Sequence, residues 1–241
     1  MKSLLFLILL TTFGYSNPAF FELNVNGVQE PTQIVQVLNI SILLALIFLL
    51  PTMILIATPF TRIVVVLSLL KQALGLQQLP PGKILISMAL ILTIFIMKPF
   101  GQEAYDNGIK PYMDKKIDYM EAFEKSAAPF KRFMHKNTRE KDLALFYRIK
   151  NIKNPKNIED IDITALVPAF MISELRRAFE IGLLLFIPFI IIDVIVSTIL
   201  MALGMMMLPP TMISMPIKVG LFLMTDAWAL IIEQLVKSFS T

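Results

Sequence analysis

The apolar run IGLLLFIPFIIIDVIVSTILMALG, residues 181–204, decides the fold class because its only charged residue is Asp193. A stretch of about 18 or more residues with few charges is long enough to cross a lipid bilayer as a helix. Three further runs, at residues 38–60, 84–100 and 212–236, are also mostly apolar. In the whole chain 56% of the residues are hydrophobic and 17% are charged, and the mean hydropathy is +0.71. The sequence therefore predicts an all-α integral membrane protein with two long hydrophobic helical hairpins.

The N-terminus reads as a secretory signal peptide over residues 1–16. Lys2 is followed by the short apolar run LLFLILL and then by the small residues Gly14 and Ser16, where cleavage is expected. The apolar run is short for a helix that crosses a bilayer, and the alternative is an uncleaved first membrane helix. A cleaved signal peptide would start the mature protein in the periplasm.

The segments that follow are expected to alternate across the membrane. Residues 61–83, TRIVVVLSLLKQALGLQQLPPGK, carry basic residues and no acid, so the positive-inside rule places them on the cytoplasmic side. We expect four regions after the signal peptide: an N-terminal periplasmic segment (17–37), a first hydrophobic helical hairpin (38–100), a polar helical periplasmic region (101–177) and a second hydrophobic helical hairpin with a methionine-rich loop (178–241).

Helical periodicity in the polar region predicts two amphipathic helices. The first is indicated by apolar residues at helical spacing: Met113, Ile117, Met120, Phe123 and Ala127. The second begins with Thr138 as N-cap and acids in its first turn, and then presents three apolar residues: Leu143, Phe146 and Tyr147. A further helix over residues 168–180 leads into the membrane, and Glu174 is spaced to pair with Arg177 on it.

Composition excludes several kinds of chemistry. The chain has no cysteine and one histidine, so it cannot build a disulfide, a thiol nucleophile, or a thiolate or multi-histidine metal site. The segment from Gly75 to Lys83 is a poor Walker A loop, because six residues separate its glycines and no serine or threonine follows the lysine. The net charge is +4, but basic residues are interleaved with acids and lack an aromatic stacking platform, which favours anionic lipid headgroups over nucleic acid. We expect no catalytic residue, no metal and no cofactor.

Charges inside the apolar runs carry more information. Asp193 lies in the third run, and Lys218 and Asp226 lie in the fourth. A charge at the centre of a membrane helix costs about 2.5–3.5 kcal/mol, so each should find a partner. Counted from the middle of the intervening loop, Asp193 and Lys218 are about one turn out of level, roughly 6 Å at ~1.5 Å per residue. The flexible lysine could close this gap within one chain, but we expect a bridge between subunits, which needs no distortion. A proton or ion relay in a transporter is the alternative.

The loop GMMMLPP, residues 204–210, joins the last two apolar runs. Methionine is unbranched and polarizable, and it fills irregular gaps while tolerating rearrangement. Met205, Met206 and Met207 could therefore form a deformable apolar seal, or an apolar loop that rests in the membrane interface. The two prolines stop the loop from continuing as helix.

A resemblance to a known family rests on four long runs: TPFTRIVVVLSLLKQALGLQQLPP, PFKRFMHKNTREKDLALF, PAFMISELRRAFEIGLLLFIPFIIID and LMALGMMMLPPTMISMPIKVGLFLMTDAW. These runs, and almost everything after the first thirty-odd residues, resemble the FliP family of flagellar export-gate proteins. The injectisome homologues of that family are the close alternative. They usually lack a cleavable signal peptide, so the one expected here favours the flagellum.

The resemblance implies a subunit of the export gate of the flagellar type III secretion apparatus, in the bacterial inner membrane at the flagellar basal body. It implies that five copies assemble with FliQ and FliR, and work with other flagellar export apparatus proteins, as a helical cone around a channel for unfolded flagellar export substrates. It also implies that Met205, Met206 and Met207 form a gate and that Asp193 and Lys218 pair between adjacent copies. Three further positions match residues of subunit contacts and gate assembly: Phe133, Phe146 and Glu174.

Two functions from other classes stay open on the residues alone. A small ion-coupled secondary transporter would titrate Asp193, Lys218 and Asp226 during substrate coupling. A structural membrane scaffold would tolerate replacement of the loop methionines without leaking or losing export.

Overall fold

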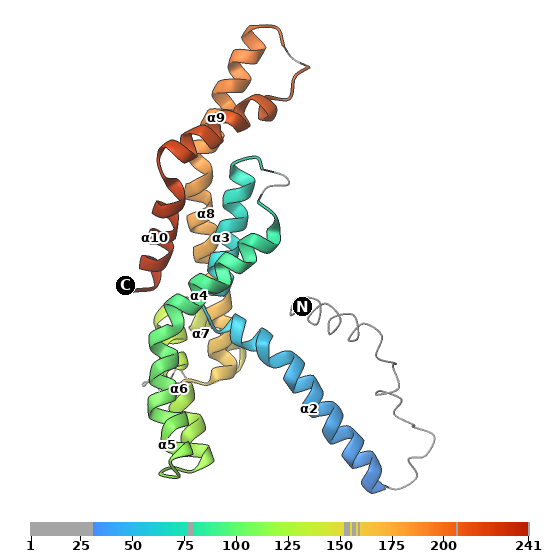
Figure 1. The fold of residues 1–241 in the computed structure, drawn as a ribbon, viewed down its shortest axis with the longest axis vertical. Coiled ribbons are helices and arrows are strands. Elements are labelled where there is room, and N and C mark those ends of the chain that lie inside the picture. Colours follow the sequence, from blue (N-terminus) through green and yellow to red (C-terminus); the bar gives the residue numbers. More distant parts are fainter. Residues whose placement is uncertain are drawn as a thin grey trace, which may run out of the picture. The chain divides into compact units, whose positions relative to one another are not determined.

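The computed structural model describes most of the chain beyond residue 30: residues 31–76, 80–151, 155, 158, 160–205 and 207–240. Every regular element in this part is a helix, which confirms the predicted all-α class (Figure 1). The signal peptide expected at residues 1–16 lies outside the described residues. The chain forms two compact units, residues 1–50 and residues 51–241.

The first unit contributes residues 31–50 of helix α2 (Pro31–Ile56), which has no charged residue in its 26 positions. Proline suits the first position of a helix because its missing N–H would have no partner there. The helix ends four residues before the predicted end at residue 60, because Pro59 disfavours a helical conformation at the residue before it. The hydroxyl of that residue, Thr58, donates to the Leu55 carbonyl oxygen at 2.8 Å and closes the end.

The second unit contains the helices that follow. In chain order they are α3 (Phe60–Ala73), α4 (Gly82–Ala104), the π-helix η3 (Tyr105–Ile109), α5 (Lys110–Met113), α6 (Tyr119–Asn137), α7 (Glu140–Ile149), α8 (Ile163–Ala202), α9 (Pro210–Met224) and α10 (Ala227–Ser240). Among the described residues, two helical stretches are long and apolar enough to cross a membrane, Gly82–Met113 and Ile163–Ala202. The pair α9 and α10, bent by 67°, adds a third if it forms one broken span.

Helix α3 packs along α8 and forms the core of this unit (Figure 1). Four aliphatic residues of α3 recur at helical spacing and are fully buried: Ile63, Val66, Leu67 and Leu70. Buried residues of α8 repeat every four positions: Leu166, Phe170, Glu174, Ala178 and Gly182. Of these, Glu174 contacts Arg62 and Gly182 lies against Leu69 on α3. The segment expected on the cytoplasmic side, residues 61–83, thus contains a helix whose buried face packs in this core, and its side of the membrane stays a prediction.

Helix α8 is one continuous helix of 40 residues, which joins the predicted helix at 168–180 to the apolar run at 181–204. Asp162 is its N-cap and accepts a hydrogen bond from the Thr164 backbone N–H at 2.9 Å. The ammonium of Lys150, 2.6 Å from the Asp162 carboxylate, and the Thr164 groups lower the pKa of Asp162 to about 2. The cap therefore keeps its charge at neutral pH.

The fourth apolar run, predicted as one segment over 212–236, breaks at Asp226. This residue has a φ of 48°, in the left-handed region that aspartate tolerates better than most side chains. Its carbonyl oxygen accepts from the N–H groups of Ala229 and Leu230 at 3.1 and 3.3 Å and so begins α10. Asp226 is consequently exposed at a bend and does not lie within a straight span.

The two amphipathic helices of the polar region exist, but the first one buries a different face from the predicted one. Lys115, with a φ of 57°, ends α5 in a left-handed turn, so Met113 and Ile117 precede α6. Met120 and Phe123 are exposed. The reason is a close approach between η3 and α6, where a Cβ at Gly108 would lie 2.8 Å from the Ala122 carbonyl oxygen.

The second amphipathic helix begins later than predicted. Thr138 ends α6, and its hydroxyl donates to the Met134 carbonyl oxygen at 2.7 Å. Arg139 is the N-cap of α7, and its backbone N–H donates to the Ser173 hydroxyl on α8 at 3.0 Å. A contact between distant helices therefore sets this boundary, which a local capping signal could not reveal.

Replacing Gly108 by alanine tests the approach of η3 to α6. The added methyl group would collide with backbone atoms of Ala122 and Ser126, so we expect a loss of about 1–3 kcal/mol in the free energy of unfolding. Gly101, in α4, has no atom within 4 Å of its ideal Cβ. Gly101→Ala should therefore stabilise by roughly 0.5–1 kcal/mol. Unfolding in detergent, followed by circular dichroism, measures both changes, and effects of the same sign would contradict this account.

Candidate functional site

Two of the three charges that the sequence places in the last two apolar runs, Asp193 and Lys218, meet in one cluster, whereas Asp226 lies outside it. Lys218 on α9 is 3% exposed, and its Nζ donates to Asp193 Oδ2 on α8 at 2.6 Å. It also donates to the carbonyl oxygen of Ala73 at 3.1 Å. Because Ala73 is the last residue of α3, the cation lies at the negative end of that helix. The Ser214 hydroxyl donates to the other carboxylate oxygen at 2.5 Å.

In the single chain, Asp193 and Lys218 pair with each other, and the expected bridge between subunits stays a prediction. Asp193 lies nine residues before the last residue of α8, and Lys218 lies eight residues after the first residue of α9. The two side chains are thus nearly level when distance is counted from the helix ends. Counting from the middle of the loop gave a false offset, because the loop residues are not helical and α9 begins only at Pro210.

The methionine-rich loop is held firmly where it leaves α8. Gly204 has a φ of 75°, and the N–H groups of Gly204 and Met205 donate to the carbonyl oxygens of Met201 and Leu200 at 3.0 and 2.9 Å. This pattern is a Schellman motif, in which glycine supplies the left-handed conformation. Pro209 is then the N-cap of α9 and Pro210 its first residue. Helix ends fix both sides of the loop.

The tip of this loop is apolar and uncovered in a single chain. Met207 is 99% exposed and Met205 is 43% exposed, while Met206 lies outside the described residues. Leu203 and Leu208 beside them are also exposed. Contiguous exposed apolar side chains are typical of surfaces that another chain or a membrane covers.

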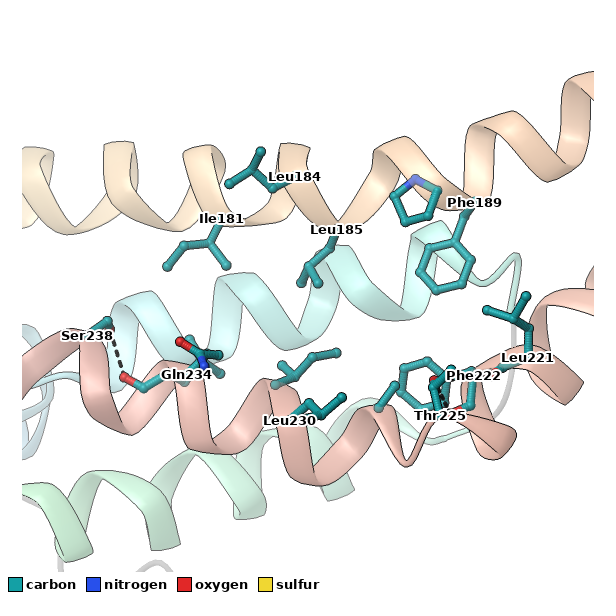
Figure 2. A pocket seen from close by; sticks show the side chains of 14 residues that line it. Ile181, Leu184, Leu185, Phe189, Leu221, Phe222, Thr225, Leu230, Gln234 and Ser238 are labelled. Carbon is teal, nitrogen blue, oxygen red and sulfur yellow. Dashed lines mark hydrogen bonds between the residues drawn. The ribbon is translucent and has the colours of Figure 1, made fainter.

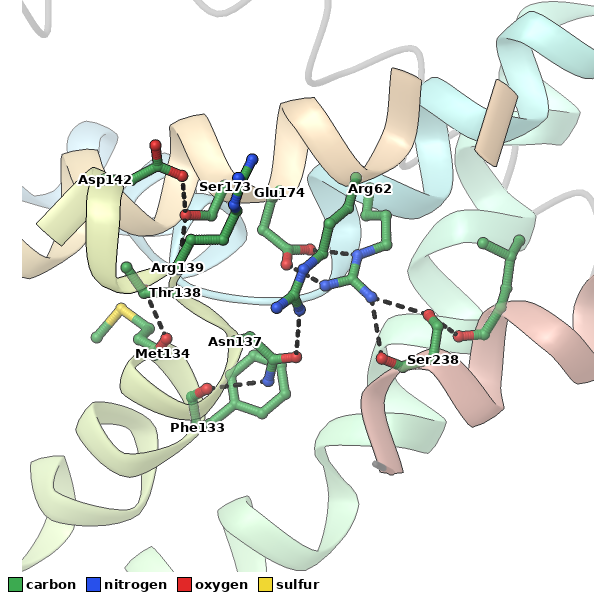
Figure 3. A network of polar contacts seen from close by, with 12 residues as sticks. Arg62, Phe133, Met134, Asn137, Thr138, Arg139, Asp142, Ser173, Glu174 and Ser238 are labelled. Atoms are coloured by element: carbon green, nitrogen blue, oxygen red, sulfur yellow. Dashed lines mark hydrogen bonds and ion pairs between the residues drawn. The ribbon is translucent and has the colours of Figure 1, made fainter. Parts of the chain in front are cut away.

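A second ion pair joins α3 and α8 (Figure 3). Arg62 on α3 is 1% exposed and Glu174 on α8 is fully buried. Arg62 Nε donates to Glu174 Oε2 at 3.0 Å, and a second guanidinium nitrogen contacts Oε1, so the pair is bidentate. The same guanidinium donates to the Ser238 carbonyl and hydroxyl oxygens at 3.1 and 2.8 Å, and it lies 3.7 Å from the Phe239 ring centroid.

This second pair was not predicted, because Glu174 was expected to pair with Arg177 one turn along the same helix. The structure gives Glu174 the partner Arg62, 112 residues away, and Arg177 instead donates to the Asn137 side chain at 3.4 Å. One signal was available in the sequence. Arg62 stands immediately before an aliphatic run, and a cation on a buried helix requires an acid.

The three positions that the family resemblance links to assembly lie in different environments. Phe133 is buried in an aromatic cluster, with its ring centroid 5.1 Å from that of Phe100 and 6.0 Å from that of Phe170. Glu174 is inaccessible in the ion pair with Arg62. Phe146 on α7 is half-buried. Of these three, only Phe146 can contact another chain without a change in the fold.

The sites around Asp193 and Glu174 consist of ion pairs, hydrogen bonds and apolar contacts. Among the described residues, no group of three or more histidine, cysteine or acidic side chains could hold a metal ion. No buried side-chain nitrogen or oxygen in this part of the chain lacks a hydrogen-bond partner. The buried charges are therefore satisfied within the chain and stabilise its arrangement.

Comparison with known proteins gives a consistent match. The sequence matches the FliP family over residues 43–235. It is 45% identical to the flagellar biosynthetic protein FliP of Bacillus subtilis (strain 168) over 217 residues, 90% of this chain and 98% of that protein. It is 48% identical to the same-named protein of Caulobacter vibrioides over 197 residues, 82% of this chain and 74% of that protein. It is also 45% identical to the same-named protein of Pectobacterium carotovorum over 214 residues, which are 89% of this chain and 82% of that protein.

Methionine substitutions test the buried pair between Arg62 and Glu174. Glu174→Met leaves a buried cation without its acid and should cost about 3–5 kcal/mol of the free energy of unfolding. The double change Arg62→Met with Glu174→Met removes both charges and should recover most of that loss. Glu121→Met, in the exposed pair with Lys125 on α6, is the control and should cost ~1 kcal/mol or less. Denaturant unfolding in detergent measures all three variants, and a double variant less stable than Glu174→Met would refute the pairing argument.

Proposed function

The chain belongs to the FliP family, and from that premise we propose that it is a channel-forming subunit of the flagellar type III protein export gate. It has a role in flagellar biosynthesis within the flagellar export apparatus, as a component embedded in a membrane. The proposed channel conducts unfolded flagellar proteins across the bacterial inner membrane at the basal body. The three relatives above all carry the flagellar name, which supports this function over that of an injectisome homologue.

The observation that carries the proposal is the exposed methionine tip between α8 and α9. A nearly fully exposed methionine at the end of a capped helical hairpin is costly in water and is stabilised when other copies cover it. In a ring of five copies the tips would converge and form a gasket. Methionine suits this role because its flexible side chain repacks around different sequences, whereas a β-branched residue is stiff.

Assembly with further copies and with FliQ and FliR, as a helical cone, is part of the same proposal. Phe133 and Glu174 would support it indirectly, by holding α3, α6, α8 and α10 together within one chain. Phe146 is exposed enough to lie in a contact with another chain. The long exposed apolar stretch of α8, which includes Leu183, Leu184, Ile191 and Ile195, gives neighbouring copies and lipid a surface to cover.

We further propose that the chain is not an enzyme and that other components supply the energy for export. Near the start of α4, Lys71 Nζ donates to the Pro80 carbonyl oxygen at 3.0 Å, a contact within the chain. The transporter alternative requires Asp193 and Lys218 to exchange protons or ions. Their closed contact, with Lys218 buried, favours a structural pair instead.

Replacing Met205, Met206 and Met207 by alanine tests the gasket. Smaller side chains leave gaps between the tips, so we expect the assembled complex to leak ions while export of hook and filament proteins continues. The wild-type gene should restore export to a strain that lacks it. The leak is measured as membrane depolarisation in that strain, complemented with each variant.

A matched control replaces three exposed methionines outside the loop, Met113, Met120 and Met224, by alanine. This variant should export normally and stay sealed. A sealed pore with the loop alanines would contradict the gasket. Export that persists without the gene would contradict the flagellar gate as a whole.

A further inference from the structure

An apolar groove runs between α8 and the bent pair α9 and α10, with a volume of about 570 Å³ (Figure 2). Ile181, Leu185 and Phe189 line it from α8, and Phe222 and Leu230 line it from the opposite wall. Figure 2 shows Ile181 and Ser238 at one end, and Phe189 and Phe222 at the other. The groove is partly open to the surroundings. In a membrane, its surroundings are acyl chains.

A polar pocket of about 300 Å³ adjoins the end of the groove at Ile181 and Ser238, since both residues line both cavities. Its other walls carry five polar or charged side chains: Arg62, Lys136, Asn137, Arg177 and Glu180. The acid Glu174 already neutralises Arg62. Lys136 has no ion-pair partner among the described residues. Arg177 donates to the Asn137 amide oxygen at 3.4 Å and shares the field of Glu174 with Arg62. Two cations therefore face this pocket against the single exposed carboxylate of Glu180.

We propose that the groove and the pocket together bind one anionic phospholipid, with an acyl chain along the groove and the phosphate beside Lys136 and Arg177. Basic pockets between membrane helices are suited to acidic headgroups, because a phosphate offers several acceptor oxygens. From Ile181 to Phe189 the groove is about 12 Å long at ~1.5 Å per residue. That is close to half of the ~30 Å hydrocarbon core, which is the depth of one leaflet.

The sequence of α8 agrees with this placement. Charged residues end at Glu180, and the next charge along the helix is Asp193. The pocket thus lies where the helix passes from a polar to an apolar environment, and the groove lies wholly on the apolar side. The proposal concerns one chain in a membrane and does not depend on its being an export gate.

The only tryptophan of the chain, Trp228, reports on the groove. It follows the lining residue Ala227, and its ring packs edge-on against Phe222, with centroids 5.3 Å apart. The full chain is reconstituted in phosphatidylcholine vesicles that contain brominated phosphatidylglycerol or, separately, brominated phosphatidylcholine as guest lipid. Bromine on the acyl chain quenches tryptophan fluorescence at short range. We expect stronger quenching by the anionic guest, and a smaller difference at high salt.

The double variant Lys136→Gln with Arg177→Gln should lose this preference, by roughly fivefold in relative affinity for each cation removed. The control is Lys141→Gln with Arg176→Gln, which removes two exposed cations that do not line the pocket. Lys136→Arg with Arg177→Lys keeps both charges and should keep the preference. Circular dichroism checks that each variant is folded. If the glutamine variant is not folded, the salt dependence of quenching in the wild type decides whether the lipid preference is electrostatic.

Three results would overturn the proposal. Equal quenching by the two guest lipids would mean non-selective contact with acyl chains. A glutamine variant as selective as the wild type would place the charge recognition elsewhere. Absence of quenching by either lipid, with chemical cross-linking between chains, would show that a second copy covers the groove.

Discussion

The buried pair between Arg62 and Glu174 is the contact on which the arrangement of the second unit depends. A guanidinium and a carboxylate are costly to remove from water, and the cost is recovered only if every donor and acceptor finds a partner. Here the bidentate contact, the two oxygens of Ser238 and the ring of Phe239 provide those partners. Three helices, α3, α8 and α10, are thereby held in one register.

The pair between Asp193 and Lys218 repeats this device further along α8. Nineteen residues separate Glu174 from Asp193, about 28 Å of helix. The first pair joins α8 to the start of α3. The second pair joins α8 and α9 to the end of α3 at Ala73. Helix α8 is thus fixed at two points, and its last nine residues extend beyond the second one. The exposed methionine loop is the end of that extension, which gives it a defined position without a cover from its own chain.

Local sequence signals predicted much of this structure. The apolar runs and the helical spacing of apolar residues in the polar region indicated an all-α membrane chain, and two prolines indicated where the loop before α9 ends. These features depend on residues close together in the chain, where periodicity and capping act directly.

Features that depend on partners far apart in sequence could not be predicted in the same way. Arg62 looked like a cytoplasmic cation because the positive-inside rule counts charges without regard to burial. The acid that pairs with it is 112 residues away. The buried face of α6 depends on Gly108, whose missing side chain lets η3 approach. The break at Asp226 could not be predicted, because a residue other than glycine adopts the left-handed conformation there and the sequence around it remains mostly apolar.

We infer that the buried charges are paired within each chain and so fix the hairpin that carries the loop. Asp193→Lys and Lys218→Asp test it when secretion of flagellar proteins is measured for each single variant, for both changes in one chain, and for the two single variants expressed together. We expect both changes in one chain to restore part of the secretion. The mixed chains should restore none, since no single chain then has an opposite pair. Equal restoration by the mixed chains would show that the pair forms between neighbouring copies and would contradict the claim.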